Sequence, residues 1–214
     1  MEVHARAEGR VEAAPACTSP ARAGKRKHKQ NYLLNIATPP LIAGGITHTG
    51  PIAGGMMRSK LFVPGARPDL FAKAWSSGAD AVSFDLEDSV AQERKARARA
   101  DVAAFLASRP DAGPLAIVRI NAPGSAHFAA DLAAIVPARP GLLNVPKLES
   151  AAQVREVVAR VESAVARAPG AAMPRLLVNI ETPRGLRHAA EIAAAHPCVA
   201  GLQLGLGDLF EPQG

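Results

Sequence analysis

The chain has 214 residues, of which 48% are hydrophobic and 21% are charged, so it is long enough to bury a core and has the composition of one soluble globular domain. Its net charge of +6 is a poor indicator of nucleic-acid binding, because +4 of that charge lies in residues 1–57 and aromatic residues make up only 4% of the chain. Cys17 and Cys198 lie far apart with no Cys-x-x-Cys, which argues against a disulfide framework or a zinc site and favours a reduced, cytoplasmic protein.

Residues 1–57 show no sustained hydrophobic period of 2 or 3.6, and we interpret them as a disordered or low-complexity leader. The basic run at 25–29 is typical of a solvated face. Pro51 and several glycines interrupt the apolar stretch at 41–57, so no membrane span is expected. Because Met56 and Met57 directly precede the first convincing strand, a native start at that point is a further hypothesis.

From residue 58 onward, short apolar runs alternate with stretches of helical pattern, which predicts βαβ units and a parallel sheet. The predicted strands are Leu61–Val63, Ala81–Leu86, Leu115–Ile120, Leu142–Val145, Leu176–Ile180 and Gly201–Leu206.

Two predicted helices carry clear start signals. Ser150 and Gln153 form a capping box, and Thr182 followed by Pro183 places an N-cap before a proline at the first helical position. The helix after Ser150 has a valine stripe that should face the core. A further helix is expected from about Ala91 to Ser108.

Six strand–helix units of this length predict an α/β fold of the TIM (β/α)₈ barrel type, with about six of the eight units present. We therefore assign 58–214 to a partial barrel domain. Since a complete barrel takes about 250 residues, two strands and any C-terminal element are expected to be missing.

Catalytic groups of such barrels lie at the carboxyl ends of the strands. Glu181 and Asp208 end two adjacent predicted strands, which lie about 4.8 Å apart, so both carboxylates can reach one ion. Two hard oxygen ligands with room for water suit Mg²⁺, or Mn²⁺. The alternative is that Glu181 caps the helix that follows it.

Further polar residues follow the other strands. Arg119 ends an apolar strand, so it should meet a carboxylate, and its position favours a ligand's carboxylate. Strand alternation predicts Asp85 and Glu87 on one face and Asp88 on the other. Lys147 could be a Schiff-base lysine, but an ion pair is the simpler interpretation. The glycines around Leu206 should allow close backbone approach beneath the metal.

Taken in order, these motifs resemble the citrate lyase β-subunit-like (HpcH/HpaI aldolase) family. The resemblance covers about 58–210 and rests on Arg58-Ser59-Lys60-Leu61-Phe62-Val63-Pro64-Gly65, Asp85-Leu86-Glu87-Asp88-Ser89-Val90, Lys95, Val118-Arg119-Ile120-Asn121, Asp131-Leu132, Pro146-Lys147-Leu148-Glu149, Ile180-Glu181-Thr182 and Gly205-Leu206-Gly207-Asp208.

The resemblance implies a Mg²⁺-dependent carbon–carbon lyase that cleaves or forms a 3-hydroxyacyl thioester, such as malyl-CoA, citramalyl-CoA or a citryl thioester, giving an acyl thioester and a 2-oxo acid. It implies that Glu181 and Asp208 hold the metal, that Arg119 and Glu181 contact the substrate, and that all three are catalytic. It also implies a homo-oligomer, a trimer or a hexamer. The family's C-terminal lid, which brings the carboxylate that protonates the enolate, is expected to be absent.

Two alternatives stay open. The chain could be the β-subunit of a citrate lyase complex, which acts on a carrier-protein thioester, or it could be a non-catalytic truncated homologue. No nucleic-acid or membrane partner is expected.

Overall fold

The computed structural model of the protein describes residues 32–34 and 57–210. Most of the predicted leader therefore lies outside the described residues. The strands are β1 (Tyr32–Leu34), β2 (Lys60–Pro64), β3 (Ala81–Asp85), β4 (Leu115–Arg119), β5 (Leu142–Val145), β6 (Arg175–Ile180) and β7 (Val199–Leu204). The helices are α1 (Phe71–Trp75), α2 (Lys95–Ser108), α3 (Phe128–Ile135), α4 (Ala151–Ala166), α5 (Pro183–Arg187), α6 (Ala189–Ala193) and α7 (Leu206–Phe210), with short 3₁₀ turns at Pro68–Leu70 and Gln92–Arg94.

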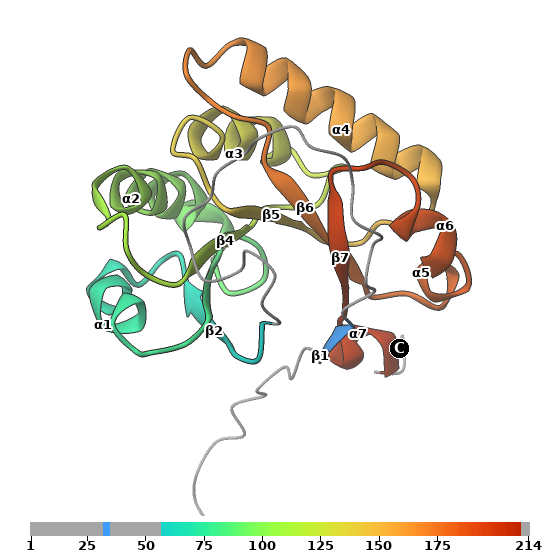
Figure 1. Ribbon diagram of the computed structural model, residues 1–214, viewed down its shortest axis with the longest axis horizontal. Coiled ribbons are helices and arrows are strands. Elements are labelled where there is room, and N and C mark those ends of the chain that lie inside the picture. The colour runs from blue at the N-terminus through green and yellow to red at the C-terminus, as the bar shows by residue number, and fades with distance from the viewer. Residues whose placement is uncertain (1–31, 35–56, 211–214) are drawn as a thin grey trace, which may run out of the picture.

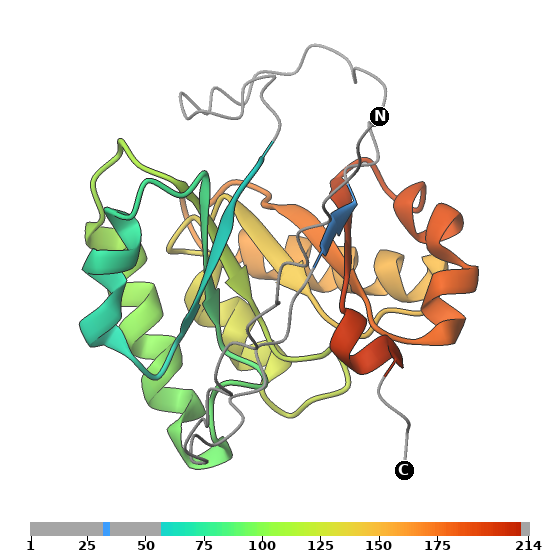
Figure 2. The same cartoon turned by 90° about the horizontal axis from the view of Figure 1, so that it is seen from below.

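Strands β2 to β7 form a parallel sheet in which each strand lies beside the next one along the chain. The helices between them lie along the outer side of the curved sheet (Figures 1 and 2). This arrangement confirms the predicted α/β fold with six successive strand–helix units. No helix in the described part of the chain combines the length and the hydropathy needed to cross a membrane.

Strand β1 was not predicted. It pairs antiparallel with β7, with Tyr32 opposite Leu204, and so extends the sheet at the end away from β2. A sheet edge offers unpaired backbone groups to any extended segment. A three-residue strand of this kind is therefore set by its partner strand, and local sequence pattern carries little signal for it.

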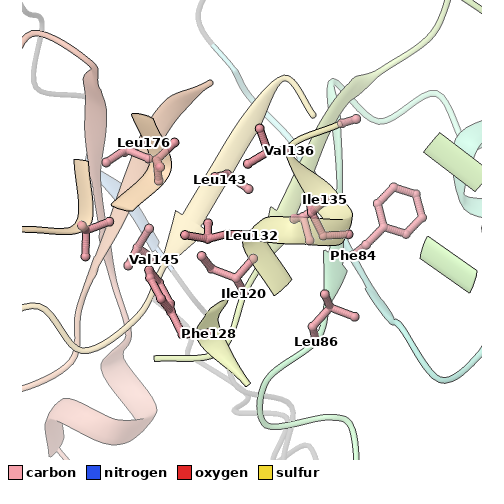
Figure 3. Packing of buried hydrophobic residues seen from close by; sticks show 14 of the residues in the cluster. Phe84, Leu86, Ile120, Phe128, Leu132, Ile135, Val136, Leu143, Val145 and Leu176 are labelled. Atoms are coloured by element: carbon pink, nitrogen blue, oxygen red, sulfur yellow. The ribbon is translucent and has the colours of Figure 1, made fainter. Parts of the chain in front are cut away.

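The main core lies between the sheet and the outer helices (Figure 3). Alternate residues of each strand point to it, as Val82 and Phe84 do in β3. The other face of the sheet carries a smaller apolar cluster, made of Ala81, Ile117, Leu142 and Leu177. Beyond that cluster, the same inner face carries the polar residues that form the candidate site.

Two of the three predicted helix starts, those at Ser150 and Thr182, are confirmed. Ser150 Oγ accepts a hydrogen bond from Gln153 N at 3.2 Å, and Thr182 Oγ1 accepts one from Gly185 N at 3.0 Å. The Gln153 side chain accepts from Glu149 N, one residue before the position of a standard capping box. The predicted helix from Ala91 begins instead at Lys95, because a 3₁₀ turn occupies the preceding residues.

Phe84 anchors the outer core, since it is fully buried and its ring lies 5.0 Å from that of Phe71. We expect Phe84→Ala to lower the free energy of unfolding by about 3–5 kcal/mol, because it removes this contact area and leaves a cavity. Phe210→Ala is the control: that side chain is 72% exposed, and its loss should change stability by less than about 0.5 kcal/mol. Urea denaturation checks both, and equal effects would contradict this description of the core.

Candidate functional site

The site is organised around a buried ion pair between the last residues of two neighbouring strands. Asp85 ends β3 and Arg119 ends β4, and the two residues are direct partners in the sheet register. Arg119 Nε and one terminal nitrogen donate to the two Asp85 oxygens at 2.7 and 2.6 Å. Arg119 is 5% exposed, so its charge needs such a partner. Arg119 was expected to pair with a carboxylate, and Asp85 of the protein provides one.

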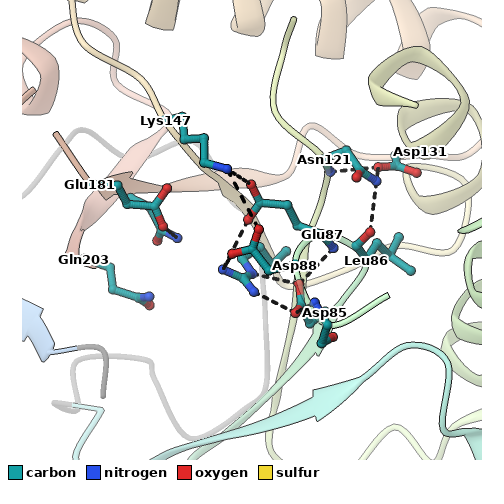
Figure 4. A network of polar contacts seen from close by, with 12 residues as sticks. Asp85, Leu86, Glu87, Asp88, Asn121, Asp131, Lys147, Glu181 and Gln203 are labelled. Carbon is teal, nitrogen blue, oxygen red and sulfur yellow. Dashed lines mark hydrogen bonds and ion pairs between the residues drawn. The ribbon is translucent and has the colours of Figure 1, made fainter. Parts of the chain in front are cut away.

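Two more carboxylates gather on the same guanidinium. Glu87 lies 3.2 Å and Asp88 3.3 Å from Arg119 Nη1, and Figure 4 shows both acids pointing into this cluster. The predicted separation of Asp88 from Asp85 and Glu87 is therefore wrong. Strand β3 ends at Asp85, so the residues after it turn out of the pleat and alternation no longer decides where they point.

Lys147 closes the cluster from the end of β5. Its Nζ lies 2.9 Å from Glu87, which agrees with the ion-pair interpretation. Its φ of 61° lies in the left-handed region, which costs a non-glycine residue about 1–3 kcal/mol and is typical of functional sites. Burial raises the pKa of Glu87, although the charges of Arg119 and Lys147 act against this rise.

Hydrogen bonds from buried side chains hold the loop that carries Glu87 and Asp88 in place. Lys95 is buried, and its Nζ donates to the backbone oxygens of Leu86 and Glu87 at 2.9 and 2.8 Å. Asn121 Nδ2 donates to Leu86 O at 3.0 Å and to Asp131 at 2.7 Å. Lys95, Asn121 and Asp131 belong to the motifs of the family resemblance, but the sequence alone assigned them no role.

Glu181 lies directly after β6 and is 3% exposed. Its Oε1 accepts a hydrogen bond from Asn179 at 3.1 Å, whereas its buried Oε2 has no hydrogen-bond partner among the described residues. Burial raises the pKa of the Glu181 carboxyl to about 7; the charges of Glu87 and Asp208 add to the rise, and Arg119 opposes it. Glu181 is thus a carboxylate whose charge the described residues do not fully balance.

The sequence placed Asp208 at the end of a strand, but in the structure it lies beyond that strand. Strand β7 ends at Leu204, and Asp208 occupies the first turn of α7. It remains close enough to Glu181 to act on that carboxylate electrostatically. Gly205 makes room for this arrangement, since a Cβ atom there would lie 2.6 Å from Glu181 Cγ.

The charge of the site fits a divalent cation. Five carboxylates gather here, those of Asp85, Glu87, Asp88, Glu181 and Asp208. Among the described residues, Arg119 and Lys147 form ion pairs with three of them, and Lys60 and Lys95 act on the cluster electrostatically, which leaves the carboxylates in excess. Within the described residues there is no group of three His, Cys, Asp or Glu side chains arranged to hold a metal. A metal here would therefore take two protein carboxylates and complete its shell with water or substrate, as Mg²⁺ commonly does.

A second set of polar residues, which the sequence reading did not single out, lies on the inner face. Ser83, Asn144, Asn179 and Gln203 are fully buried, and Lys60 Nζ donates to Gln203 Oε1. Burial lowers the pKa of Lys60 to about 7; the charge of Arg119 adds to this effect, and Asp85 opposes it. A polar residue at an inward-facing position of a mostly apolar strand is the sequence feature that could have identified this set.

Comparison with known proteins now gives the family. The model of the HpcH/HpaI aldolase/citrate lyase family matches residues 58–213. The chain belongs to this family.

Relatives and solved structures agree with that assignment. The chain is 38% identical to citrate lyase subunit beta of Escherichia coli over 71% of its own length and 50% of the relative's. It is 36% identical to an L-malyl-CoA/beta-methylmalyl-CoA lyase of Cereibacter sphaeroides over 73% and 50%. A citrate lyase beta subunit from Mycobacterium tuberculosis, solved with oxaloacetate and magnesium, is 39% identical, with a TM-score of 0.55 over 70% of this chain and 58% of that one. The HpcH/HpaI chain thus spans about half the length of the curated relatives it matches.

The lowered pKa of Lys60 gives this family member a pH-dependent stability. The unfolded chain binds a proton at Lys60 up to about pH 10.4, and the folded chain only up to about 7. Stability should therefore rise with pH between these values, and the full penalty should be present below pH 7. Lys60→Met removes the penalty, so urea denaturation should show it gaining stability over wild type at pH 6.5 relative to pH 9.5. A difference that does not vary with pH would contradict this.

Gly205→Ala tests the packing against Glu181. The added methyl group would force the Glu181 side chain to move, so, with Glu181 as a magnesium ligand as proposed below, magnesium affinity should fall at least tenfold while far-UV circular dichroism stays unchanged. Gly124→Ala is the control, because a Cβ atom there meets nothing within 4 Å. Equal affinities for the two variants by calorimetric titration would argue against close packing at Gly205.

Proposed function

We propose that this chain provides the metal and substrate-carboxylate site of a magnesium-dependent carbon–carbon lyase. The substrate class is a 3-hydroxyacyl thioester, of CoA or of an acyl-carrier protein, and the other product is a 2-oxo acid. One observation supports the proposal most directly: the buried Glu181 Oε2 has no hydrogen-bond partner in the part of the chain that the structure describes, and it lies in a cluster with an excess of carboxylates. The magnesium and oxaloacetate in the related Mycobacterium tuberculosis structure support it.

Each residue then has a defined task. Glu181 and Asp208 hold Mg²⁺ (or Mn²⁺), which would acidify the substrate hydroxyl and polarise the carbonyl that replaces it. The hydroxyl would give its proton to solvent water, the bond between the carbinol carbon and the thioester α-carbon would break, and its electron pair would leave as the enolate. A proton taken back from solvent would then add to that α-carbon, so that the protons balance. The direction of the reaction depends on the concentrations of the two products.

Arg119 binds substrate and stabilises the enolate in this scheme. A guanidinium has five N–H donors; Asp85 takes Nε and one terminal nitrogen, and Glu87 and Asp88 lie at the other terminal nitrogen. The bidentate pair with Asp85 fixes the plane of the group before substrate arrives. Pre-organised charge of this kind stabilises a developing anion more than a mobile side chain does.

A citrate lyase β-subunit is the second candidate, because the Escherichia coli relative with that name is as similar as the CoA-ester lyase. In that case the thioester is carried on a protein, and the chain works inside a complex. Turnover of citryl thioester only in the presence of the other subunits would favour this candidate. A homo-oligomer, a trimer or a hexamer, stays a prediction for the first.

Calorimetric titration of the full chain with Mg²⁺ tests the metal site. We expect saturable binding that Glu181→Gln and Asp208→Asn each weaken by at least tenfold, because each variant removes one charged oxygen ligand. Glu191→Gln is the control, an acid that pairs with His188 at the surface. Absence of magnesium binding in a folded wild-type sample would contradict the proposal and leave a non-catalytic homologue.

The same titration in the presence of oxaloacetate or glyoxylate tests the substrate side. We expect the 2-oxo acid to bind only when magnesium is present, and Arg119→Lys to weaken its binding while magnesium still binds. A 2-oxo acid affinity that is unchanged in Arg119→Lys would remove Arg119 from the substrate site.

A further inference from the structure

A row of buried polar side chains lines the inner face of the sheet below the candidate metal site. Asn144, Asn179 and Gln203 come from the three successive strands β5, β6 and β7, and all are fully buried. The interior of a barrel sheet is usually filled by branched apolar residues. Amides at such positions are costly unless they are hydrogen-bonded, so this row calls for a specific explanation.

The side chains of Asn179 and Gln203 are complementary to each other. The two residues are direct partners in the register of β6 and β7. Asn179 donates its amide N–H to Glu181 Oε1 at 3.1 Å, and its buried Oδ1 has no hydrogen-bond partner within 32–34 and 57–210. Gln203 accepts through Oε1, and its buried Nε2 has no hydrogen-bond partner in the same described part of the chain. A free acceptor thus lies on one strand and a free donor on the residue beside it.

A third residue, Lys60, donates a hydrogen bond to Gln203 from the opposite end of the parallel sheet. It starts β2, yet its Nζ reaches across the inner face to Gln203 on β7. The same nitrogen lies 4.4 Å from the centre of the Phe62 ring, which holds it inside the sheet. Figure 4 shows Gln203 and Glu181 projecting from their strands toward the same interior.

We propose that Lys60, Gln203 and Asn179 form a hydrogen-bonded relay that orients the Glu181 carboxylate, with an ordered water joining Gln203 Nε2 to Asn179 Oδ1. A water in this place would satisfy both unpartnered atoms. The relay fixes Glu181 Oε1 through Asn179 and leaves Oε2 for the metal. Lys60, Gln203 and Asn179 are positioning residues, and their role in metal binding rests on the proposed function of Glu181.

The relay makes a definite prediction for magnesium affinity. Groups that hydrogen-bond to a metal ligand and orient it typically contribute 10–100-fold to metal affinity. Lys60→Met and Gln203→Met should each raise the dissociation constant for Mg²⁺ about 10-fold in calorimetric titration of the full chain. Because both variants interrupt one series of hydrogen bonds, the double variant should bind no more weakly than either single variant. Ser83→Ala, also fully buried on the inner face, is the matched control and should bind like wild type.

A second measurement does not need the metal. In the ¹⁵N NMR spectrum of the magnesium-free protein, Lys60→Met should shift the side-chain amide signal of Asn179 through Gln203, as the relay requires, and Ser83→Ala should not. An Asn179 signal that does not respond to Lys60→Met overturns the relay.

The possible outcomes separate the two proposals. If wild type binds magnesium and Glu181→Gln does not, while Lys60→Met and Gln203→Met bind normally, the relay is overturned and the metal site stands. Fully multiplicative losses in the double variant also overturn the relay, because they show two independent packing effects. If wild type binds no magnesium, the proposed function fails, and a transmitted Asn179 shift would still support the hydrogen-bonded series.

Discussion

The bidentate pair between Asp85 and Arg119 is the interaction on which the rest of the site depends. It joins the ends of β3 and β4, and it sets the position at which Glu87 and Asp88 meet the guanidinium. Removing either partner would leave a buried, uncompensated charge, which typically costs about 3–5 kcal/mol. The pair therefore joins the two strands and holds Arg119 where its charge opposes the rise in the pKa of Glu181.

The two faces of the sheet have different functions. The outer face packs Val82, Phe84 and similar residues against the helices and provides the core. The inner face is apolar only at one end, where Ala81 and Ile117 cluster, and becomes polar toward the strand ends. The stability that the outer core provides offsets the free-energy cost of burying carboxylates and amides on the inner face.

Sequence reasoning found the parts of this structure that depend on local pattern. The six parallel strands, the caps at Ser150 and Thr182 and the polar strand ends all follow from periodicity and side-chain chemistry. It was wrong about the direction of the Asp88 side chain, because the alternation of residues along a strand does not show where the strand ends. It also missed Lys60 and Gln203, which lie 143 residues apart and meet only because the sheet curves. The roles of Glu181 and Asp208 as metal ligands stay predictions.

The position of β1 has a consequence for the order in which the chain can fold. Strands β2 to β7 each pair with a neighbour in sequence, so their contacts can form one after another as synthesis proceeds. Strand β1 is near the start of the chain, but among the described strands it pairs only with β7, which comes last of them in sequence. Its contact has the greatest sequence separation in the sheet, and closing that loop belongs to a late step. Until β7 has emerged from the ribosome, Tyr32–Leu34 has no strand to join.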